Sequence, residues 1–336
     1  MTTTWTGAAK SLVDRIEAFV YSSLDGEPLE DFDALALDVH RWQREHDEVL
    51  AALEEAEPTC WQEIPAVPTA LFQRLDVGTV EPEEAAVVFR TSGTSTGLRG
   101  VHALRSTELY DRGATAWFRT CVPDAPTEIV ALLEDPAQAP DSSLSHMVAL
   151  FGQATWHVES GVLARGSLAS RVRNTAAPLF VATTAFALAD WLDGDVPVLP
   201  PDSILMVTGG FKGRDVQVQE VDLYRQARRR LRPDRIVTEY GMTELSSQLW
   251  GLPDAPYRPP PWLEVLAVSP ATGEALEPGR VGQLRFFDLC NLDSTLAVET
   301  LDEGLVQSDG SVILYGRLAG APARGCSLVV EEGWNR

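Results

Sequence analysis

The chain has 336 residues, 45% hydrophobic and 23% charged, which is enough apolar material for one large domain or two smaller ones. Its formal net charge of −22 disfavours nucleic acid and anionic membranes as partners, because both attract clustered cations. The four cysteines form no C-x-x-C pair, the five histidines form no H-E-x-x-H motif, and no segment approaches the ~20 apolar residues needed to span a bilayer. We therefore expect a cytoplasmic protein without a zinc site, a disulfide scaffold or a membrane span.

The first third of the chain predicts helices followed by a strand. Residues 8–23 and 29–55 show apolar positions at helical spacing. Prolines between residues 58 and 68 then force an extended connection. Residues 85–89 form a short apolar run, which predicts a buried strand that leads directly into a polar loop.

From residue 128 onward, strand patterns alternate with helical patterns. The expected strands are 128–133, 179–183, 204–207 and 235–238, and the expected helices are 143–151, 185–192 and 218–231. This alternation predicts a mostly parallel sheet that is covered by helices. Ligands in such sheets bind beyond the carboxyl ends of the strands, so the loops at those ends are the first candidates for a site.

After three consecutive prolines at 259–261 the pattern changes to short antiparallel strands. They are expected at 262–268, 282–288, 296–300 and 312–315, with turns between them. The expected organisation is a helical segment at 1–60, an α/β core at 61–255, a β-rich subdomain at 256–316 and a tail at 317–336.

The polar loop after the strand at 85–89 is rich in hydroxyl groups and glycine. Its residues are Ser92, Gly93, Thr94, Ser95, Thr96 and Gly97. Such a loop can hold phosphate oxygens with its amides and hydroxyls, since glycine lets the main chain approach closely. It is not a Walker A sequence, because no Gly-Lys-Ser/Thr follows. An ordinary polar turn is the alternative interpretation.

A second candidate segment, Thr-Glu-Tyr-Gly-Met-Thr-Glu at 238–244, lies at the end of an expected strand. The ring of Tyr240 could stack on a base, Thr243 could place a hydroxyl on a phosphate, and Glu244 could ligate Mg²⁺. The alternative is a helix that starts at Thr243, which is an acceptable N-cap residue. Together with the upstream loop, this segment suggests a site for ATP with Mg²⁺.

Gly209 and Gly210 follow another expected strand and would leave one face of the backbone bare beside a bound ring. Lys212 and Arg214 are close enough in sequence to counter phosphate charge. A plain turn between strand and helix is an equally good interpretation of this segment.

Two further features have a simple and a functional interpretation. Six arginines between residues 225 and 235 are best explained as a solvated helix face, and the alternative is a docking patch for an acidic protein. Cys326 follows Arg324, and a nearby guanidinium lowers a thiol pKa, so this thiol could accept an acyl group. The alternative is an inert core cysteine. His102, His146 and His157 are expected to be structural.

These residues together resemble the acyl-protein synthetase (LuxE-type) family of bacterial fatty-acid reductase systems, within the wider acyl-adenylate-forming enzymes. The likeness runs from about residue 60 to the C-terminus, and Tyr-Gly-Met-Thr-Glu at 240–244 is its most specific segment. The other matching segments lie at 141–147, 208–213, 288–291, 299–304 and 316–328.

The resemblance implies an α/β adenylate-forming domain with a β-rich subdomain and without the full C-terminal lid domain. It also implies roles by position. Residues 92–97 would be the phosphate loop, Gly209 and Gly210 would lie against adenine, Tyr240 would stack on it, and Gly241 would also belong to the cofactor-binding residues. Thr243 and Glu244 would serve the phosphate and Mg²⁺, Asp302 would bind the ribose hydroxyls, Arg317 would contact ribose or phosphate, and Cys326 would carry the acyl group as a thioester.

The chain departs from the family pattern near the loop and in the tail. The loop is one residue longer than the usual Ser-Gly-Thr-Thr-Gly, and Arg99 lies near the place of a lysine that many adenylating enzymes carry. Ala319 stands where larger relatives carry a hinge aspartate.

The predicted function is ATP-dependent activation of a carboxylic acid, expected to be a fatty acid, to acyl-AMP. The acyl group would then pass to a protein thiol and on to an acyl reductase or acyltransferase partner. One alternative is an acid–CoA ligase of the phenylacetate type. Another is a non-catalytic nucleotide-binding subunit of a reductase complex, which the altered loop favours.

Overall fold

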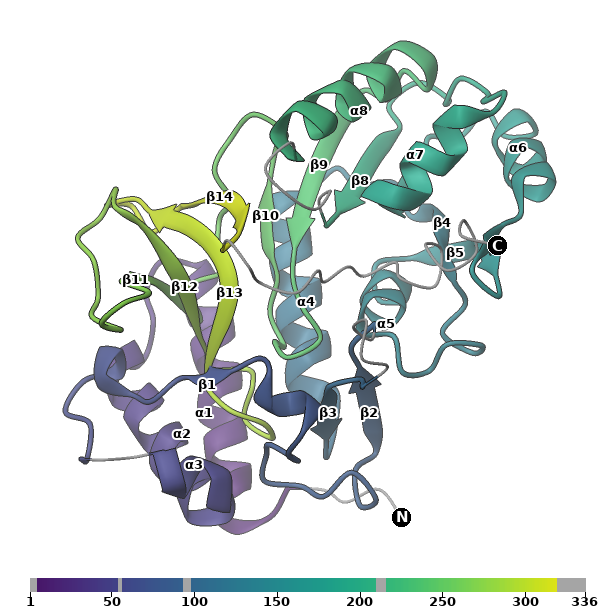
Figure 1. Cartoon of the computed structure of the whole chain (residues 1–336). Coiled ribbons are helices and arrows are strands. Elements are labelled where there is room, and N and C mark those ends of the chain that lie inside the picture. Colours follow the sequence, from purple (N-terminus) through teal and green to yellow (C-terminus); the bar gives the residue numbers. More distant parts are fainter. Residues whose placement is uncertain (1–4, 54–55, 93–97, 210–215, 319–336) are drawn as a thin grey trace.

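The computed structural model describes residues 5–53, 56–92, 98–209 and 216–318 (Figure 1). Two sheets and a group of N-terminal helices make up most of it. Within these ranges, no helix has the length and apolar character required to cross a membrane.

A seven-stranded sheet forms the α/β part. Its strands are β4 (Glu128–Glu134), β5 (Gln153–Glu159), β6 (Val162–Leu163), β7 (Phe180–Thr184), β8 (Ile204–Thr208), β9 (Arg235–Tyr240) and β10 (Leu249–Gly251). Their order is β10-β9-β8-β7-β4-β5-β6. The five strands from β9 to β5 are parallel, and each edge strand is antiparallel to its neighbour. The parallel sheet predicted from the sequence is thus confirmed.

Helices cover both faces of this sheet. They are α4 (Glu108–Cys121), α5 (Ser143–Ala149), α6 (Arg165–Arg173), α7 (Ala185–Asp193) and α8 (Val216–Arg230). Side chains alternate along β4, where Ile129, Ala131 and Leu133 join the core beneath α4 and α5. Val130 and Leu132 join the core beneath α6, α7 and α8. A strand buried on both faces explains the continuous apolar runs in the sequence.

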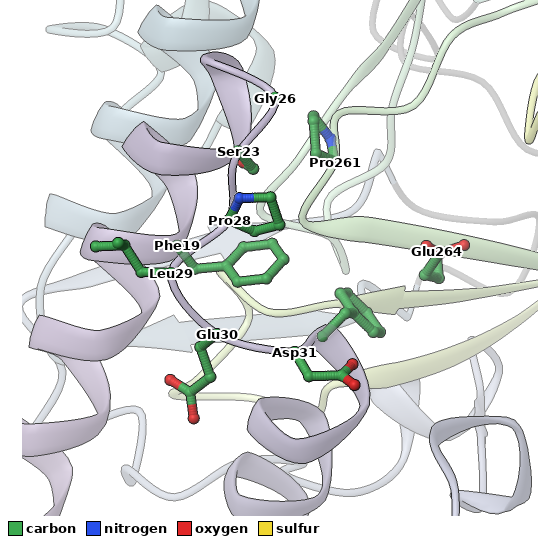
Figure 2. Close-up of a pocket in the computed structure, with 10 residues that line it drawn as sticks. Phe19, Ser23, Gly26, Pro28, Leu29, Glu30, Asp31, Pro261 and Glu264 are labelled. Atoms are coloured by element: carbon green, nitrogen blue, oxygen red, sulfur yellow. The ribbon is translucent and has the colours of Figure 1, made fainter.

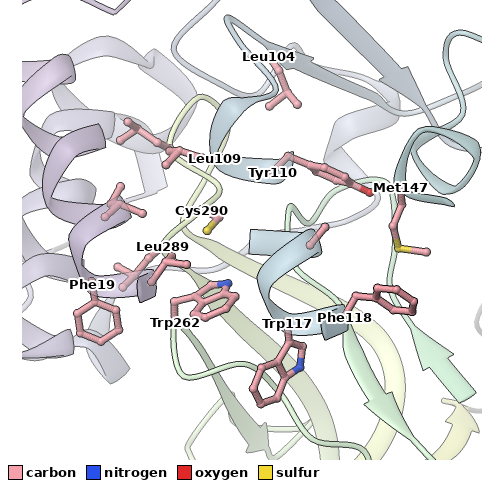
Figure 3. Close-up of a cluster of buried hydrophobic side chains, with 14 of the residues drawn as sticks. Phe19, Leu104, Leu109, Tyr110, Trp117, Phe118, Met147, Trp262, Leu289 and Cys290 are labelled. Atoms are coloured by element: carbon pink, nitrogen blue, oxygen red, sulfur yellow. The ribbon is translucent and has the colours of Figure 1, made fainter. Parts of the chain in front are cut away.

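Helix α4 was not predicted, although it is central to the packing (Figure 3). Phe118 on α4 lies edge-on to Phe180 of the sheet, with ring centroids 5.3 Å apart. Trp117 packs edge-on against Trp262, which precedes β11, at 6.0 Å. The helix therefore joins the seven-stranded sheet to the β-rich part.

A five-stranded sheet forms the β-rich part. Its strands are β1 (Val67–Pro68), β11 (Leu263–Val268), β12 (Val281–Asp288), β13 (Ala297–Val306) and β14 (Val312–Arg317). β11, β12, β13 and β14 pair antiparallel in sequence order, as predicted. β1 adds to β13 in parallel, and β13 extends six residues beyond its predicted end at residue 300.

The N-terminal helices are α1 (Gly7–Leu24), α2 (Phe32–His46) and α3 (Glu48–Leu53), and two short 3₁₀ turns follow at Trp61–Glu63 and Leu71–Gln73. The single helix predicted at 29–55 is wrong, because Asp47 has an extended backbone with φ −139° and ψ 117°. Its carboxylate accepts a hydrogen bond from the amide of Val49 at 2.7 Å, as an N-cap does.

Strands β2 (Val87–Arg90) and β3 (Val101–Leu104) form a separate antiparallel pair. The strand predicted at 85–89 therefore exists but does not belong to the parallel sheet, and only Phe89 in β2 is buried. The polar loop therefore connects two strands that are separate from the main sheet.

Candidate functional site

Two of the predicted segments meet at the carboxyl edge of the seven-stranded sheet. β8 ends at Thr208 and β9 ends at Tyr240, and the two strands pair in parallel with Thr208 opposite Glu239. Gly209 follows directly with φ +68°, a conformation that glycine adopts without strain. Gly210, residues 93–97 and Cys326 lie outside the described residues.

Tyr240, Asp302 and Arg317 come together from three strands. The Tyr240 hydroxyl donates a hydrogen bond to Asp302 Oδ2 at 2.7 Å, and Arg317 Nε lies 3.5 Å from Asp302 Oδ1. Asp302 and Arg317 are direct partners across β13 and β14. The Tyr240 ring also stacks on Phe286 of β12, with centroids 5.7 Å apart and planes 27° apart. The seven-stranded and five-stranded sheets therefore contribute to one cluster.

The charge state of Asp302 depends on opposing effects. Burial raises the pKa of Asp302, while the hydrogen bond from Tyr240 and the positive charge of Arg317 lower it. The Asp302 side chain still exposes 24% of its surface, so it remains accessible to a ligand. A carboxylate accepts hydrogen bonds only, which suits pairs of hydroxyl groups.

Glu239 lies beneath this edge and was not predicted as part of the site. It is 3% exposed, and its carboxyl accepts a hydrogen bond from the Thr208 hydroxyl. Burial raises the pKa of Glu239 to about 7, and the Thr208 hydrogen bond opposes that shift. A Cβ atom at Gly241 would lie 2.5 Å from Glu239 Oε1, so a larger residue at position 241 would displace the carboxyl.

Thr243 and Glu244 follow β9 in a turn, so the helix considered as the alternative at Thr243 is wrong. Glu244 is 1% exposed. In the described part of the chain, no group of three His, Cys, Asp or Glu residues could hold a metal ion. Mg²⁺ is commonly held by one or two carboxylates together with phosphate oxygens and water, and a single carboxylate fits that arrangement.

Asn291 occupies the centre of a buried polar network behind Glu244. Its side chain donates to the carbonyl oxygens of Glu244 at 3.0 Å and Thr295 at 2.7 Å. It accepts from Ser246 Oγ at 2.9 Å, and His102 Nε2 lies 2.9 Å from the same oxygen. Burial lowers the pKa of His102 to about 4, so the ring is neutral at pH 7 and structural, as expected.

Asp288 holds the segment after β9, which contains Glu244, from a second side. Its carboxylate accepts hydrogen bonds from the amide of Ser246 at 3.0 Å and from Ser247 Oγ at 2.8 Å. Burial raises the pKa of Asp288 to about 6. Asp288 and Asn291 belong to the segment 288–291, which resembles the acyl-protein synthetase family, but no role is predicted for either residue. The sequence signal that could have identified Asp288 and Asn291 is that they form a polar pair in an otherwise apolar stretch.

The stem of the polar loop is held in place on both sides. The amide of Thr91 donates to the carbonyl of Gly100 at 3.0 Å. Arg99 donates from Nε to the Thr91 carbonyl at 2.6 Å and from Nη1 to Asp141 at 2.5 Å. Arg99 therefore clamps the stem of the polar loop.

Three of the six arginines in the arginine-rich stretch pair with neighbouring acids. The pairs are Arg225 with Asp222, Arg228 with Asp254 at 3.6 Å and Arg235 with Asp124 at 2.6 Å. Arg230 donates to two backbone carbonyls. These contacts favour the solvated helix face over a docking patch.

A recess of about 650 Å³ lies between α1, the turn after it and the start of β11 (Figure 2). Phe19 and Pro261 line it, and Glu30, Asp31 and Glu264 stand around it. It shares no residue with the cluster at the carboxyl edge of the sheet. We therefore do not assign the candidate site to this recess.

The structure is similar to solved synthetases. It matches ATP-bound MatB from Rhodopseudomonas palustris with a TM-score of 0.51 and 13% identity, over 71% of this chain and 49% of MatB. It matches o-succinylbenzoate coenzyme A synthetase (MenE) from Bacillus subtilis, in complex with ATP and magnesium ion, with a TM-score of 0.52 and 14% identity, over 71% of this chain and 52% of MenE. MenE in complex with the acyl-adenylate intermediate OSB-AMP also gives a TM-score of 0.52.

The chain spans about half the length of the first two of these structures. Its sequence matches no protein-family model. No curated protein matches it either. The acyl-protein synthetase family therefore stays a prediction. At 13–14% identity the likeness shows the fold, and the chain has the α/β fold of the N-terminal domain of adenylate-forming synthetases, with a β-rich subdomain.

Proposed function

We propose that this chain binds ATP at the carboxyl edge of its seven-stranded sheet and uses it to convert a carboxylic acid into an acyl adenylate. The convergence of Tyr240, Asp302 and Arg317 beside Gly209 carries this proposal. An aromatic ring next to bare glycine backbone suits an adenine base, and a carboxylate suits the two hydroxyls of a ribose. The fold shared with ATP-bound MatB and MenE supports the same reading.

In the proposed first step, a carboxylate oxygen of the acid attacks the α-phosphorus of ATP. The bond between that phosphorus and the bridging oxygen breaks, and pyrophosphate leaves. Asp302 would hold the ribose and Arg317 would offset negative charge, so both would act by positioning and electrostatics. Ser92, residues 93–97 and Thr243 would offer hydroxyls and amides to the phosphates.

Glu244 would hold Mg²⁺ beside the phosphates, and the bound ion would supply charge neutralisation. One buried carboxylate with phosphate oxygens as further ligands is a suitable donor set for this ion. The neighbouring residues of the turn after β9 would fix the orientation of the Glu244 carboxylate.

The proposal also includes the group that accepts the acyl chain in a second step. A thiolate, proposed to be Cys326, would attack the acyl carbonyl and release AMP, giving a thioester for an acyl reductase or acyltransferase. The proposed substrate is a fatty acid, on the resemblance of the sequence alone. Coenzyme A is the second candidate acceptor, because MenE is a coenzyme A synthetase of the same fold.

Exchange of labelled pyrophosphate into ATP, dependent on an added carboxylic acid, tests the first step. We expect exchange with at least one member of a panel of fatty and aromatic acids. Product analysis with and without coenzyme A then separates the two acceptors. A chain that binds nucleotide yet catalyses no exchange with any acid of the panel would instead be a non-catalytic subunit.

Replacement of Cys326 by serine should remove most of the covalent labelling by a radioactive acid in the presence of ATP. Serine keeps the size of the residue but is a much weaker nucleophile than a thiolate. The matched control is Cys121→Ser, because burial raises the pKa of that thiol to about 11 and keeps it protonated. We expect at least a fivefold loss of label for Cys326→Ser only. Retention of hydroxylamine-sensitive label would exclude Cys326 as the acceptor.

A further inference from the structure

We propose that Asn291 is a positioning residue that fixes the backbone of Glu244 against the hairpin of the polar loop, and so sets how strongly Mg²⁺ improves nucleotide binding. The inference rests on the proposed function, since it assigns the geometry of the Glu244 segment to an ATP–Mg²⁺ site. Asn291 itself is fully buried and need not contact the ligand.

The orientation of the Asn291 amide follows from its partners. Its nitrogen faces two backbone carbonyls, those of Glu244 and Thr295, which can only accept. Its oxygen therefore accepts from both Ser246 Oγ and His102, and the His102 ring must carry its proton on Nε2. All four hydrogen-bonding positions of the amide are filled. Such a saturated buried amide holds one geometry, because any rotation would leave a polar group unpaired.

The groups that Asn291 joins belong to both halves of the proposed phosphate and metal site. His102 lies on β3, where it is the register partner of Phe89 on β2, and the polar loop connects these two strands. Glu244 lies in the turn after β9. Asn291 is thus a direct hydrogen-bonded bridge between the loop hairpin and the proposed metal ligand.

The bridge is itself held from behind. Gln43 on α2 donates to the carbonyls of Asn291 and Leu292, both at 3.0 Å, and accepts from the amide of Leu296 at 2.9 Å. Asp288 holds the amide of Ser246. The Glu244 carbonyl and the Ser246 amide are therefore fixed by Asn291 in this anchored loop and by Asp288 at the end of β12, which leaves little freedom for the segment between them.

The experiment measures ATP binding with and without Mg²⁺, using a fluorescent ATP analogue and full-length protein. Asn291→Asp keeps the shape but replaces the donor nitrogen with an oxygen that faces two carbonyls. We expect the Mg²⁺-dependent gain in affinity to fall at least tenfold, while Mg²⁺-free affinity changes less than threefold. Electron paramagnetic resonance of Mn²⁺ added with ATP reports the metal directly and should show the same loss.

Two further variants keep the inference falsifiable. Ser246→Ala removes one hydrogen bond to Asn291 and should shift the Mg²⁺ dependence in the same direction by a smaller factor, about two- to threefold. Ser203→Ala is the matched control, because Ser203 is also fully buried and accepts from the amide of Leu179 at 3.0 Å on a different part of the sheet. It should lower the melting temperature without changing the Mg²⁺ dependence.

The outcomes separate the inference from the proposed function. A parent protein that binds no nucleotide would contradict the proposed function. A parent that gains affinity from Mg²⁺, with an unchanged gain in folded Asn291→Asp, would overturn only the role of Asn291. If Asn291→Asp fails to fold, an unchanged Mg²⁺-dependent gain in affinity in Ser246→Ala would overturn the role of Asn291 instead. An equal loss in Ser203→Ala would mean that the effect reflects general destabilisation.

Discussion

Replacement of Asp302 by alanine should reduce acid-dependent pyrophosphate exchange by about 100-fold, since hydrogen bonds to a charged acceptor contribute about 1.5–3 kcal/mol each and the variant removes that acceptor. The variant removes the acceptor of the Tyr240 hydroxyl and the counter-charge of Arg317 in one change. It would also remove the proposed ribose ligand. Asp302→Asn keeps an acceptor oxygen but loses the charge, so we expect a smaller reduction of about tenfold.

The control for Asp302 is its neighbour Glu303. Successive side chains on a strand point to opposite faces, so Glu303→Gln removes a charge from β13 on the other face of the sheet. It should leave both KM for ATP and exchange within about twofold. If Asp302→Ala exchanges at the parental rate with the parental KM for ATP, Asp302 does not bind the nucleotide. The cluster with Tyr240 would then be a structural contact between the two sheets.

The main sheet could be read from the sequence because its signals are local. β8 and β9 are short apolar runs that end at glycine or at a polar segment, and helix α8 between them has its own periodicity. Helix α4 also carries a pattern, since Tyr110, Ala114 and Trp117 are buried at helical spacing, and it could have been found. No element is predicted from the sequence between residues 98 and 127.

Other features depend at least in part on contacts between distant residues. The break between α2 and α3 requires Asp47, whose second oxygen accepts from the amide of Gly78, 31 residues away. The pairing of β1 with β13 joins residues more than 200 positions apart. Neither follows from periodicity, because each depends on which surfaces meet in the folded chain.

Some residues of the candidate site could likewise be predicted from the sequence, and others could not. Tyr240, Glu244 and Asp302 could be singled out because they belong to short specific segments. Glu239 and Asn291 were missed as individual residues, although each is buried and forms hydrogen bonds across the site. A buried polar residue is identified by its partners, and those partners come from other strands and loops.

Glu239→Gln should remove a loss of stability that the parent suffers between pH 5 and pH 8. The pKa of Glu239 is about 7 in the folded chain, against an ordinary value of 4.5. Between these values the folded chain holds a proton that the unfolded chain has released, so rising pH favours unfolding. The expected penalty at pH 8 is about 3 kcal/mol, which corresponds to about 4 °C in melting temperature for a chain of this length.

The comparison must be made as a difference between variant and parent, because other groups titrate nearby with either sign. His102 has a folded pKa of about 4 against an ordinary 6.5, so it adds stability as pH rises across that interval. Asp288, raised to about 6 from 3.8, loses stability as pH rises to that value. Both contributions are shared by parent and Glu239→Gln and cancel in the difference, which isolates Glu239.

Thr208→Val independently tests the direction of the pH effect that Glu239 has on stability. The Thr208 hydroxyl donates to the Glu239 carboxyl and lowers its pKa, so valine, which has the same shape and no hydroxyl, should move the transition to higher pH. Glutamine at 239 can still accept from Thr208, so the variant should keep the strand ends of β8 and β9 together. Melting temperatures of the three proteins at pH 5, 6, 7 and 8 and constant ionic strength provide the measurement. If the melting temperatures of the parent and Glu239→Gln change with pH in parallel, Glu239 is already ionised in the folded chain, with water or a cation compensating its charge.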